Sequence, residues 1–271
     1  MAELRDGCAT LRSAHGAIAL VPTMGALHDG HRELVRQAVA SGAGVVTSIF
    51  VNPLQFAANE DLARYPRDEQ GDLADLEESG CHLTWLPDVD VMYPPGDATI
   101  IEVAGPAESW EGEARPGHFR GVATVCAKLF GQVRPDRAYF GEKDWQQLQV
   151  VGRMVADLLL PLEIIGVPTV REPDGLALSS RNRFLTPQER ATAPMLYAVI
   201  REVRGALARG GQVDAELNAA LAKLDGAGFL VDYFALVDGP TLKRVSVVRD
   251  NARLIAAARL GSVRLIDNLA I

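Results

Sequence analysis

The chain has 271 residues, which is enough for one large domain or two modest ones, and we expect two. Hydrophobic residues make up 48% of the sequence and charged residues 23%, proportions typical of an ordinary globular protein. The formal net charge of −8 argues against nucleic acid as a partner, since a phosphate backbone is normally bound by a basic surface.

Neither secretion nor membrane insertion is expected from the sequence. The first residues are polar and helix-like, and no long apolar run follows them. Cys8, Cys81 and Cys126 are odd in number and far apart, which indicates reduced thiols rather than a disulfide framework. These features together predict a cytoplasmic protein without a membrane partner.

Strand-like apolar runs alternate with helical patterns over residues 1–168. The predicted strands are 18–21, 45–50, 82–86, 137–140 and 162–167, and the predicted helices include 32–39, 68–79 and 121–132. This alternation is typical of a Rossmann-like, doubly wound parallel sheet in the α/β class, whose ligands bind at the carboxyl ends of the strands.

The pattern changes over residues 169–271. Helices are predicted at 187–208 and 214–224, followed by short strands at 232–237, 253–258 and 263–266. Two helices followed by a run of strands indicate a smaller α+β domain. We therefore divide the chain into a Rossmann-like domain, 1–168, and a smaller C-terminal domain, 169–271.

The junction between the first predicted strand and the next helix carries two glycines and two histidines. Such a junction directs free backbone N–H groups and the positive end of a helix dipole at an anion. Gly25 and Gly30 let the main chain approach that anion without a Cβ in the way. His28 and His31 are three residues apart, so in a first helical turn they share a face and can reach one phosphate group. A zinc site is disfavoured, because no third ligand lies nearby.

The loop after the second predicted strand carries two neutral amides. Asn52 and Gln55 flank a proline, and neutral amides suit a ligand with hydroxyl groups and a carboxylate. Asn52 can instead simply close the turn, as asparagine often does. No such role is available to Gln55, which makes it the better candidate for ligand contact.

The fourth predicted strand leads into Gly141, Glu142, Lys143 and Asp144. Asp144 is the expected N-cap of the following helix. Lys143 is placed to meet a nucleotide phosphate or a substrate carboxylate, and the alternative is an exposed lysine paired with Glu142. Gln147 lies one helical turn beyond Lys143, so one ligand can contact both side chains.

A polar loop, 178–182, opens the smaller domain. It contains Ser179, Ser180 and Arg181. Two hydroxyl groups and a guanidinium make a good clamp for a polyphosphate, because the arginine fork binds two oxygens at once and keeps its charge. The same pattern also fits an ordinary serine-rich turn.

Two other charged stretches are ambiguous. Segment 115–120 is a third cationic group that fits either a ligand site or an ordinary surface loop. Asp68, Asp72 and Asp75 lie on the predicted helix 68–79, where we expect a solvated acidic face rather than metal ligands.

Five segments, in this order and spacing, resemble the pantoate-beta-alanine ligase family: 22–31, 50–56, 115–121, 140–148 and 178–182. The family belongs to the nucleotidyltransferases with a HIGH-type signature. In this sequence, residues 28–31 correspond to that signature. Residues 178–181 stand for the second signature, which is related to KMSKS. The resemblance is dense from about residue 21 to residue 185 and continues more weakly to 264–268. Ala57 and Ala58 depart from it, because the family often has Gly-Pro there.

The resemblance implies an ATP-dependent condensation of (R)-pantoate with β-alanine. The reaction would pass through a bound pantoyl adenylate and release pyrophosphate and AMP. Mg2+ is the implied cofactor, its protein ligands are not identified, and a homodimer is expected from the family alone. His28, His31, Lys143 and Arg181 would carry the catalysis.

The resemblance also implies that domain 1–168 binds ATP and pantoate and that domain 169–271 covers the active site, and it assigns binding residues by motif. The ATP site would be lined by Met24, Gly25, Ala26, Leu27, His28, Asp29, Gly30, His31, Gly141, Glu142, Lys143, Asp144, Val170, Leu178, Ser179, Ser180 and Arg181. Pantoate would be bound by Gln55 and Gln147, with Asn52 nearby.

Two other classes of function stay open. An adenylyltransferase that acts on a phosphorylated acceptor would use a similar strand-loop-helix site, but it needs a cationic pocket where this chain offers Gln55 and Gln147. A non-catalytic nucleotide-binding regulator needs neither paired histidines nor two separate cationic loops.

Overall fold

The computed structural model describes residues 1–56, 62 and 65–271, which form two compact units. Unit 1 comprises Met1–Glu142 and Gln146–Pro168, and unit 2 comprises Lys143–Trp145 and Thr169–Ile271. Lys143–Trp145 thus belongs by its contacts to unit 2, although in sequence it lies between the two segments of unit 1. Ala57 and Ala58, where the sequence departs from the resemblance, lie outside the described residues.

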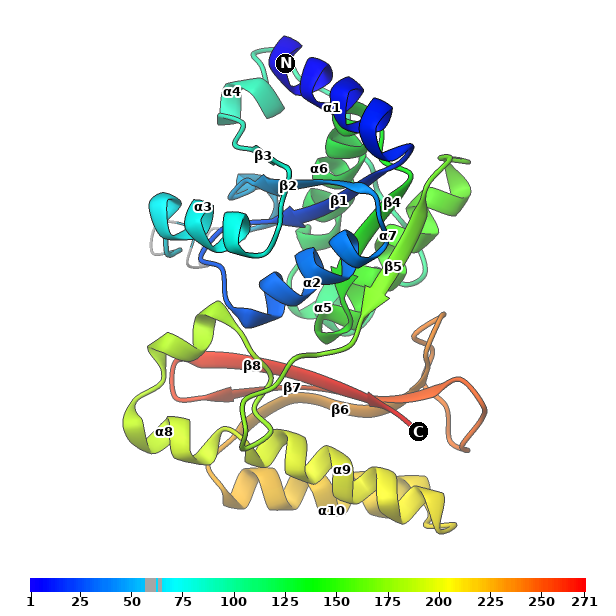
Figure 1. Cartoon of the computed structure of the whole chain (residues 1–271). Coiled ribbons are helices and arrows are strands. Elements are labelled where there is room, and N and C mark those ends of the chain that lie inside the picture. The colour runs from blue at the N-terminus through cyan, green and yellow to red at the C-terminus, as the bar shows by residue number, and fades with distance from the viewer. Residues whose placement is uncertain (57–61, 63–64) are drawn as a thin grey trace. The chain divides into compact units, whose positions relative to one another are not determined.

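A five-stranded parallel sheet forms the centre of unit 1, in the order β3-β2-β1-β4-β5 (Figure 1). The strands are β1 (Ile18–Thr23), β2 (Gly44–Ile49), β3 (Leu83–Trp85), β4 (Arg137–Gly141) and β5 (Glu163–Val167). All five were predicted within two residues of their bounds. The doubly wound α/β prediction is therefore confirmed for this unit.

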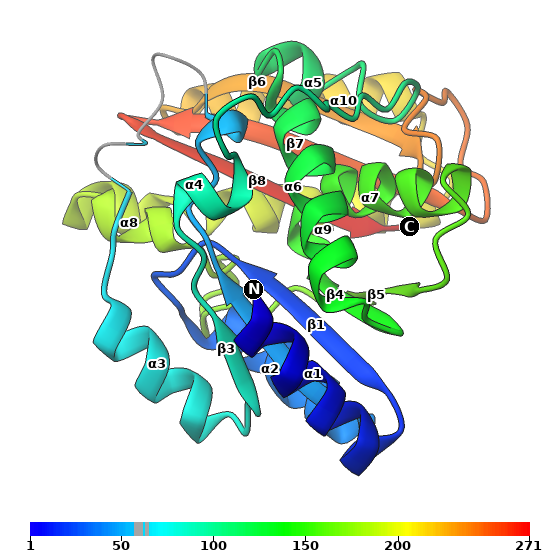
Figure 2. The ribbon, with the colours of Figure 1, turned by 90° about the horizontal axis from the view of Figure 1, so that it is seen from above.

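Helices cover both faces of this sheet (Figures 1 and 2). Val21, Val45 and Val35 belong to one buried cluster, in which α2 packs against the sheet. Alternate residues of the strands point to the opposite face, where α1 and α6 pack. Among the described residues, the helices of unit 1 are α1 (Ala2–His15), α2 (Asp29–Ala40), α3 (Glu69–Glu78), α4 (Val89–Met92), α5 (Glu111–Ala114), α6 (His118–Val133) and most of α7 (Trp145–Asp157), with the 3-10 helix η1 (Pro53–Gln55). The 3-10 helix η3 (Glu142–Asp144) and the first residue of α7 include Lys143–Trp145, which belongs to unit 2.

The strand order reverses between the neighbouring strands β1 and β4. From β1 the chain adds β2 and β3 on one side, and from β4 it adds β5 on the other side. Ligands of open α/β sheets bind beside the carboxyl ends of the strands at such a point. β1 ends where the loop to His28 begins, and β4 ends at Gly141. The fold thus places two of the predicted loops where a sheet of this kind binds its ligands.

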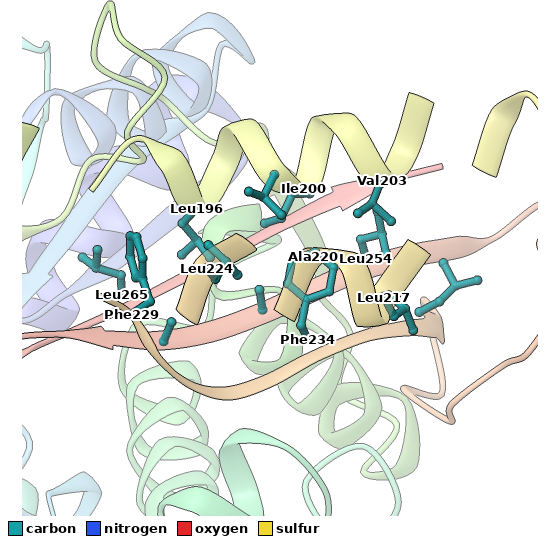
Figure 3. Packing of buried hydrophobic residues seen from close by; sticks show 14 of the residues in the cluster. Leu196, Ile200, Val203, Leu217, Ala220, Leu224, Phe229, Phe234, Leu254 and Leu265 are labelled. Carbon is teal, nitrogen blue, oxygen red and sulfur yellow. The ribbon is translucent and has the colours of Figure 1, made fainter. Parts of the chain in front are cut away.

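Unit 2 is built on a three-stranded antiparallel sheet, β6 (Leu230–Asp238), β7 (Ala252–Leu260) and β8 (Val263–Ala270). Two helices, α9 (Met195–Ala208) and α10 (Val213–Gly226), bury their apolar sides against it (Figure 3). Ile200, Leu224 and Leu254 lie in this core with no exposed surface. The predicted α+β character of this part of the chain is confirmed. Two shorter elements precede α9: η4 (Ser180–Phe184) and α8 (Pro187–Thr192).

The structure corrects two details of the predicted elements. The single helix expected at 187–208 is divided into α8 and α9, and Pro194 is the N-cap of α9. A proline lacks the N–H that a continuous helix would need there. Helix α6 begins at His118 rather than 121. Asp144 is the last residue of the 3-10 turn η3 and directly precedes α7, as the predicted N-cap position requires. Among the described residues, no helix has the length and apolar character needed to cross a membrane.

Candidate active site

The loop after β1 is held by a buried carboxylate from α3. The N–H groups of Ala26 and Leu27 donate to Asp72 Oδ2 and Oδ1 at 2.9 and 2.7 Å. Asp72 is 4% exposed. Gly25 and Ala26 have φ values of 79° and 51°, in the left-handed region that a residue with a Cβ rarely adopts. The two bonds to Asp72 hold the main chain in this conformation.

This arrangement bears on two expectations. The loop was expected to direct free backbone N–H groups at an anion, and the N–H groups of Ala26 and Leu27 in it already bind the carboxylate of Asp72. The solvated face expected for Asp72 is wrong, because this side chain is buried. Gly25 is needed here for close packing as well, because a Cβ would lie 2.8 Å from Asp72 Oδ2. A signal in the sequence was available: Asp72 precedes the buried Leu76 by four residues and so lies on the apolar side of the helix.

His28 and His31 lie together at the start of α2. His28 is the N-cap, and its Nδ1 accepts a hydrogen bond from the N–H of Gly30 at 3.1 Å. The two imidazole rings are 4.1 Å apart between centroids. Since Nδ1 of His28 is an acceptor, the neutral ring carries its proton on Nε2. The predicted pair therefore shares the first helical turn, beside the positive end of the helix dipole.

Asn52 lies in the loop after β2 and closes the turn, which was the alternative to ligand contact. Its Oδ1 accepts from the N–H of Leu54 at 3.3 Å and from the hydroxyl of Tyr93 at 2.7 Å. Its Nδ2 donates to Gln55 Oε1 and to the carbonyl of Gly121, both at 3.1 Å. All four hydrogen-bonding positions of this 1% exposed amide are thus used within the protein.

Gln55 is buried, and its orientation is set by its neighbours. Oε1 accepts from Asn52, which leaves Nε2 to donate to Met24 Sδ at 2.8 Å. A thioether sulfur is a weak acceptor, so a ligand oxygen can replace it with a gain in hydrogen-bond energy. Met24 and Gln55 come from the loops after β1 and β2, and the structure brings these two predicted site residues into contact.

The cationic segment 115–120 supports this same turn. His118 is 9% exposed, and its Nδ1 lies 2.9 Å from the carbonyl of Gln55. Arg115 Nη1 lies 3.1 Å from His118 Nε2, and an arginine can only donate, so the neutral His118 donates from Nδ1 to Gln55. Gly121 permits close packing, because a Cβ there would lie 2.4 Å from the carbonyl oxygen of Leu54.

The two glutamines at the start of α7 differ in their surroundings. Gln146 is buried and binds the main chain around α5, donating to the carbonyls of Pro106 and Ser109 and accepting from the N–H of Glu111. Gln147 is half-buried, and no side-chain hydrogen bond is formed by it among the residues that the structure describes. Its amide is therefore the one suited to a ligand.

In unit 2, Lys143 and Asp144 lie on the 3-10 turn η3. The side chain of Lys143 is 19% exposed, and Nζ lies 3.7 Å from Asp144 Oδ2. The expected alternative pairing with Glu142 is thus replaced by a loose contact with Asp144.

The other predicted site residues of unit 2 lie on a hairpin. The N–H of Leu178 donates to the carbonyl of Val170 at 3.0 Å, so these two residues face each other across it. Ser179 then caps η4, and its Oγ accepts from the N–H of Arg181 at 3.3 Å. The Ser179 hydroxyl proton is left to donate elsewhere. Ser180 and Arg181 lie in the first turn of η4 and are half-buried.

Metal ligands are not supplied by a cluster of protein side chains in the part of the chain that the structure describes. No group of three or more His, Cys, Asp or Glu side chains there is placed to hold an ion.

The comparisons with known proteins agree with one another. The family described as pantoate-beta-alanine ligase matches residues 1–270. The chain is 61% identical to pantothenate synthetase of Granulibacter bethesdensis, over 98% of this chain and 93% of that protein, and 58% identical to that of Acidiphilium cryptum, over 99% and 97%.

Solved structures show the same likeness. The crystal structure of pantothenate synthetase from Thermus thermophilus is similar with a TM-score of 0.92 and 51% identity, over 97% of both chains. Pantoate-beta-alanine ligase from Francisella tularensis, complexed with beta-gamma ATP and beta-alanine, is similar with a TM-score of 0.82 and 33% identity, over 98% of this chain and 95% of that one.

Proposed function

The chain belongs to the pantoate-beta-alanine ligase family, and from this premise we propose how its residues carry out the reaction. It is an ATP-using ligase that joins pantoate to β-alanine and forms pantothenate. In the proposed first step, a carboxylate oxygen of pantoate attacks the α-phosphorus of ATP, and the bond to the β-phosphate oxygen breaks. In the second, the β-alanine amine attacks the acyl carbon, AMP leaves, and the nitrogen loses a proton.

The first step brings two anions together and builds charge on the phosphoryl oxygens and the departing pyrophosphate. Preorganised donors and cations are therefore the main catalytic requirement. His28 and His31 meet it at the positive end of α2, with Nε2 of His28 set as a donor by the Gly30 bond. This paired arrangement is the observation that carries the proposal.

Lys143 and the segment Ser179, Ser180 and Arg181 supply further positive charge and hydroxyl donors for the phosphates. Mg2+, bound with the triphosphate, would neutralise part of the phosphate charge. Pantoate is bound by Gln55 and Gln147, since Gln55 Nε2 is held in place by the Asn52 bond to Oε1 and donates to a thioether, a weak acceptor that a pantoate oxygen can replace. Asn52 is proposed as the residue that orients Gln55 rather than one that touches pantoate.

The second step needs less chemistry from the protein. The acyl group is already activated as a mixed anhydride, so holding the amine close to the acyl carbon is sufficient. No nucleophilic serine or cysteine is required. Cys126, for example, is buried, and burial raises the pKa of its thiol to about 12.

An adenylyltransferase acting on a phosphorylated acceptor is the second candidate. Its acceptor phosphate needs cations, whereas Asn52, Gln55 and Met24 form a neutral group at the expected acceptor position. A test separates the two directly. Pyrophosphate release must depend on pantoate, and AMP must appear only after β-alanine is added; release without pantoate would contradict the assignment.

Variants test the residue roles. His31→Ala and Lys143→Ala are expected to slow pantoate-dependent pyrophosphate release by about ten- to a thousandfold, the cost of one preorganised donor. His15→Ala on α1 and Lys223→Ala on α10, both exposed, are the matched controls and should retain full activity. Equal losses in the controls, or loss of folding in the site variants, would remove the assigned roles.

The assembly and cellular location are also proposed, as a homodimer in the cytoplasm. Both rest on the family resemblance and on the composition of the chain. Sedimentation velocity at micromolar concentration tests the first: a single species with the mass of one chain would contradict it.

A further inference from the structure

Strand β8 carries a buried acid next to a buried amide, Asp267 and Asn268, 4% and 5% exposed. Residues that follow one another in a strand point to opposite faces of the sheet. Asp267 lies in alternation with Val263 and Leu265, which belong to the core with α9, and Asn268 therefore lies on the other face. The two side chains reach two different parts of unit 2.

Asp267 holds the base of the hairpin that leads to Ser179. Arg171 donates from Nη1 to Asp267 Oδ2 at 2.6 Å and from Nη2 to Oδ1 at 2.8 Å, a bidentate pair. The guanidinium also lies 3.5 Å from the ring centroid of Tyr197. Its Nη1 donates to the carbonyl of Gly175 at the hairpin tip. Arg171 is thus fixed on several sides, and β8 supplies the charge that balances it.

The hairpin transmits this position to the predicted phosphate clamp. Arg171 forms a β-bridge with Ala177, and the N–H of Leu178 binds the carbonyl of Val170. Asn182 Nδ2 donates to the carbonyl of Ala177 at 3.0 Å. Ser179 and η4 follow without an intervening free segment, so the clamp is tied to the strand through Asp267.

Asn268 holds the other cationic turn. Its Nδ2 donates to the carbonyl oxygen of Lys143 at 2.9 Å. Its Oδ1 accepts from Arg253 Nη1, and the Arg253 guanidinium lies 3.4 Å from the ring centroid of Trp145. Trp145 Nε1 in turn donates to the carbonyl of Gly239 at 2.8 Å. These contacts explain why Lys143–Trp145 belongs to unit 2.

From these contacts we infer that Asp267 and Asn268 are positioning residues that fix the Lys143 turn and the Ser179–Arg181 turn at one separation. The two turns supply the phosphate ligands of unit 2 under the proposed function, on which this inference rests. Adjacent residues of a strand cannot change their spacing, so the strand sets the distance between two groups that must contact one polyphosphate. Neither residue touches the substrate itself.

The test uses pantoate-dependent pyrophosphate release by the full chain. Asn268→Ala is expected to lower kcat by about ten- to a hundredfold, the cost of a small misplacement of a catalytic group. Asn218→Ala, the same change at an exposed position of α10, is the matched control and should leave kcat unchanged. Wild-type protein without pantoate-dependent release would contradict the proposed function instead, so the two failures are distinct.

A double-mutant cycle separates positioning from stability. If Asn268 acts through Lys143, Asn268→Ala lowers kcat little further in the Lys143→Ala background, because the group that it positions is gone. An equal fold-loss in both backgrounds would overturn the inference. Asn268→Asp guards against misfolding, since it keeps the acceptor for Arg253 and replaces the donor to the Lys143 carbonyl by a carboxylate oxygen. An unchanged kcat in this variant would overturn the inference as well.

Discussion

The loop 24–31 of unit 1 and the hairpin 171–182 of unit 2 are each held by one buried aspartate, but the second aspartate also has a charged partner. Asp72 accepts from two backbone N–H groups, those of Ala26 and Leu27. Asp267 accepts from one backbone N–H, that of Asn268, at 2.7 Å, and from the guanidinium of Arg171. Both acids are about equally buried, and both are remote in sequence from the segment they hold.

We call Asp72 the anchor of loop 24–31 and Asp267 the anchor of hairpin 171–182. The difference in their partners decides which substitutions each anchor can tolerate. The partner of Asp72 is main chain, which no substitution removes, so only the acid can be lost. The charged partner of Asp267 is a side chain, and a buried ion pair can be replaced as a pair by apolar residues at little cost. Mutation of both partners therefore distinguishes the two anchors, whereas mutation of the acid alone does not.

The largest effect is expected from Asp267→Ala. It leaves the guanidinium of Arg171 buried without a counter-charge, at a cost of about 3–5 kcal/mol in the free energy of unfolding. Adding Arg171→Met should recover the part of that loss that comes from the unpaired guanidinium, because the thioether can pack on the Tyr197 ring that the guanidinium covers. Urea unfolding measures both variants.

The control for this prediction is Asp232→Ala, which breaks the pair of Asp232 with Arg264 in the same unit, where the acid is more exposed. Its expected cost is about 1 kcal/mol or less. If the double variant is no more stable than Asp267→Ala alone, the pair is not replaceable and the comparison with Asp72 fails.

Asp72→Asn should cost about 2–3 kcal/mol. The asparagine amide has one oxygen, so its NH2 group would face the N–H of either Ala26 or Leu27. One charge-assisted bond is then lost, and a buried N–H donor is left unsatisfied. The rate of pyrophosphate release should fall as well, because His28 follows this loop directly. Denaturant unfolding and the pyrophosphate assay give the two quantities.

Asp75→Asn is the matched control, three residues along the same helix. Asp75 pairs with Arg32 at 2.5 Å at a partly exposed position, and its loss should cost about 1 kcal/mol or less. Equal effects at Asp72 and Asp75 would show that burial of the acid does not matter.

The elements were predictable where the pattern was local. The five strands of unit 1 appear as apolar runs, and the Gly-and-His junction after the first of them does place His28 and His31 on one helical turn. Hydrophobic periodicity and helix-start signals need only neighbouring residues. The fold class and this pair followed from such signals.

The anchors were not predictable, because they depend on pairs far apart in the chain. Asp72 was expected on a solvated face and the loop holding Ala26 and Leu27 was expected to have free N–H groups, since nothing local shows that these groups bind one another. The link from Asn268 to Lys143 spans 125 residues. Residue types predict which side chains contact ligands, but the contacts that support those side chains required the topology.

Gly25→Ala tests how closely Asp72 must pack against loop 24–31 of unit 1. At φ 79° a Cβ is strained, and here it would also lie 2.8 Å from Asp72 Oδ2. Gly16→Ala has nearly the same φ, 77°, with nothing within 4 Å of the added atom. We expect a loss of about 1 kcal/mol for Gly16→Ala from backbone strain and about 2 kcal/mol for Gly25→Ala. Equal losses would mean that the loop moves away from Asp72 without cost.

The smallest effect concerns the tip of the hairpin, which an exposed ion pair holds instead of a buried one. Arg190 Nη1 lies 2.5 Å from Asp174 Oδ2, and this hydrogen bond lowers the pKa of Asp174 below its usual value of 3.8. A lowered native pKa contributes stability above the unfolded-state pKa, and that contribution is lost as the pH falls through the native value. Asp174→Asn should therefore reduce stability slightly at pH 7 and make no difference at a pH below both pKa values.

The side chain of Asp174 is 43% exposed, so solvent screening keeps the effect small. Urea unfolding of wild type and variant from about pH 7 to about pH 2.5 measures the difference, and a gap that widens as the pH falls would contradict the assigned sign.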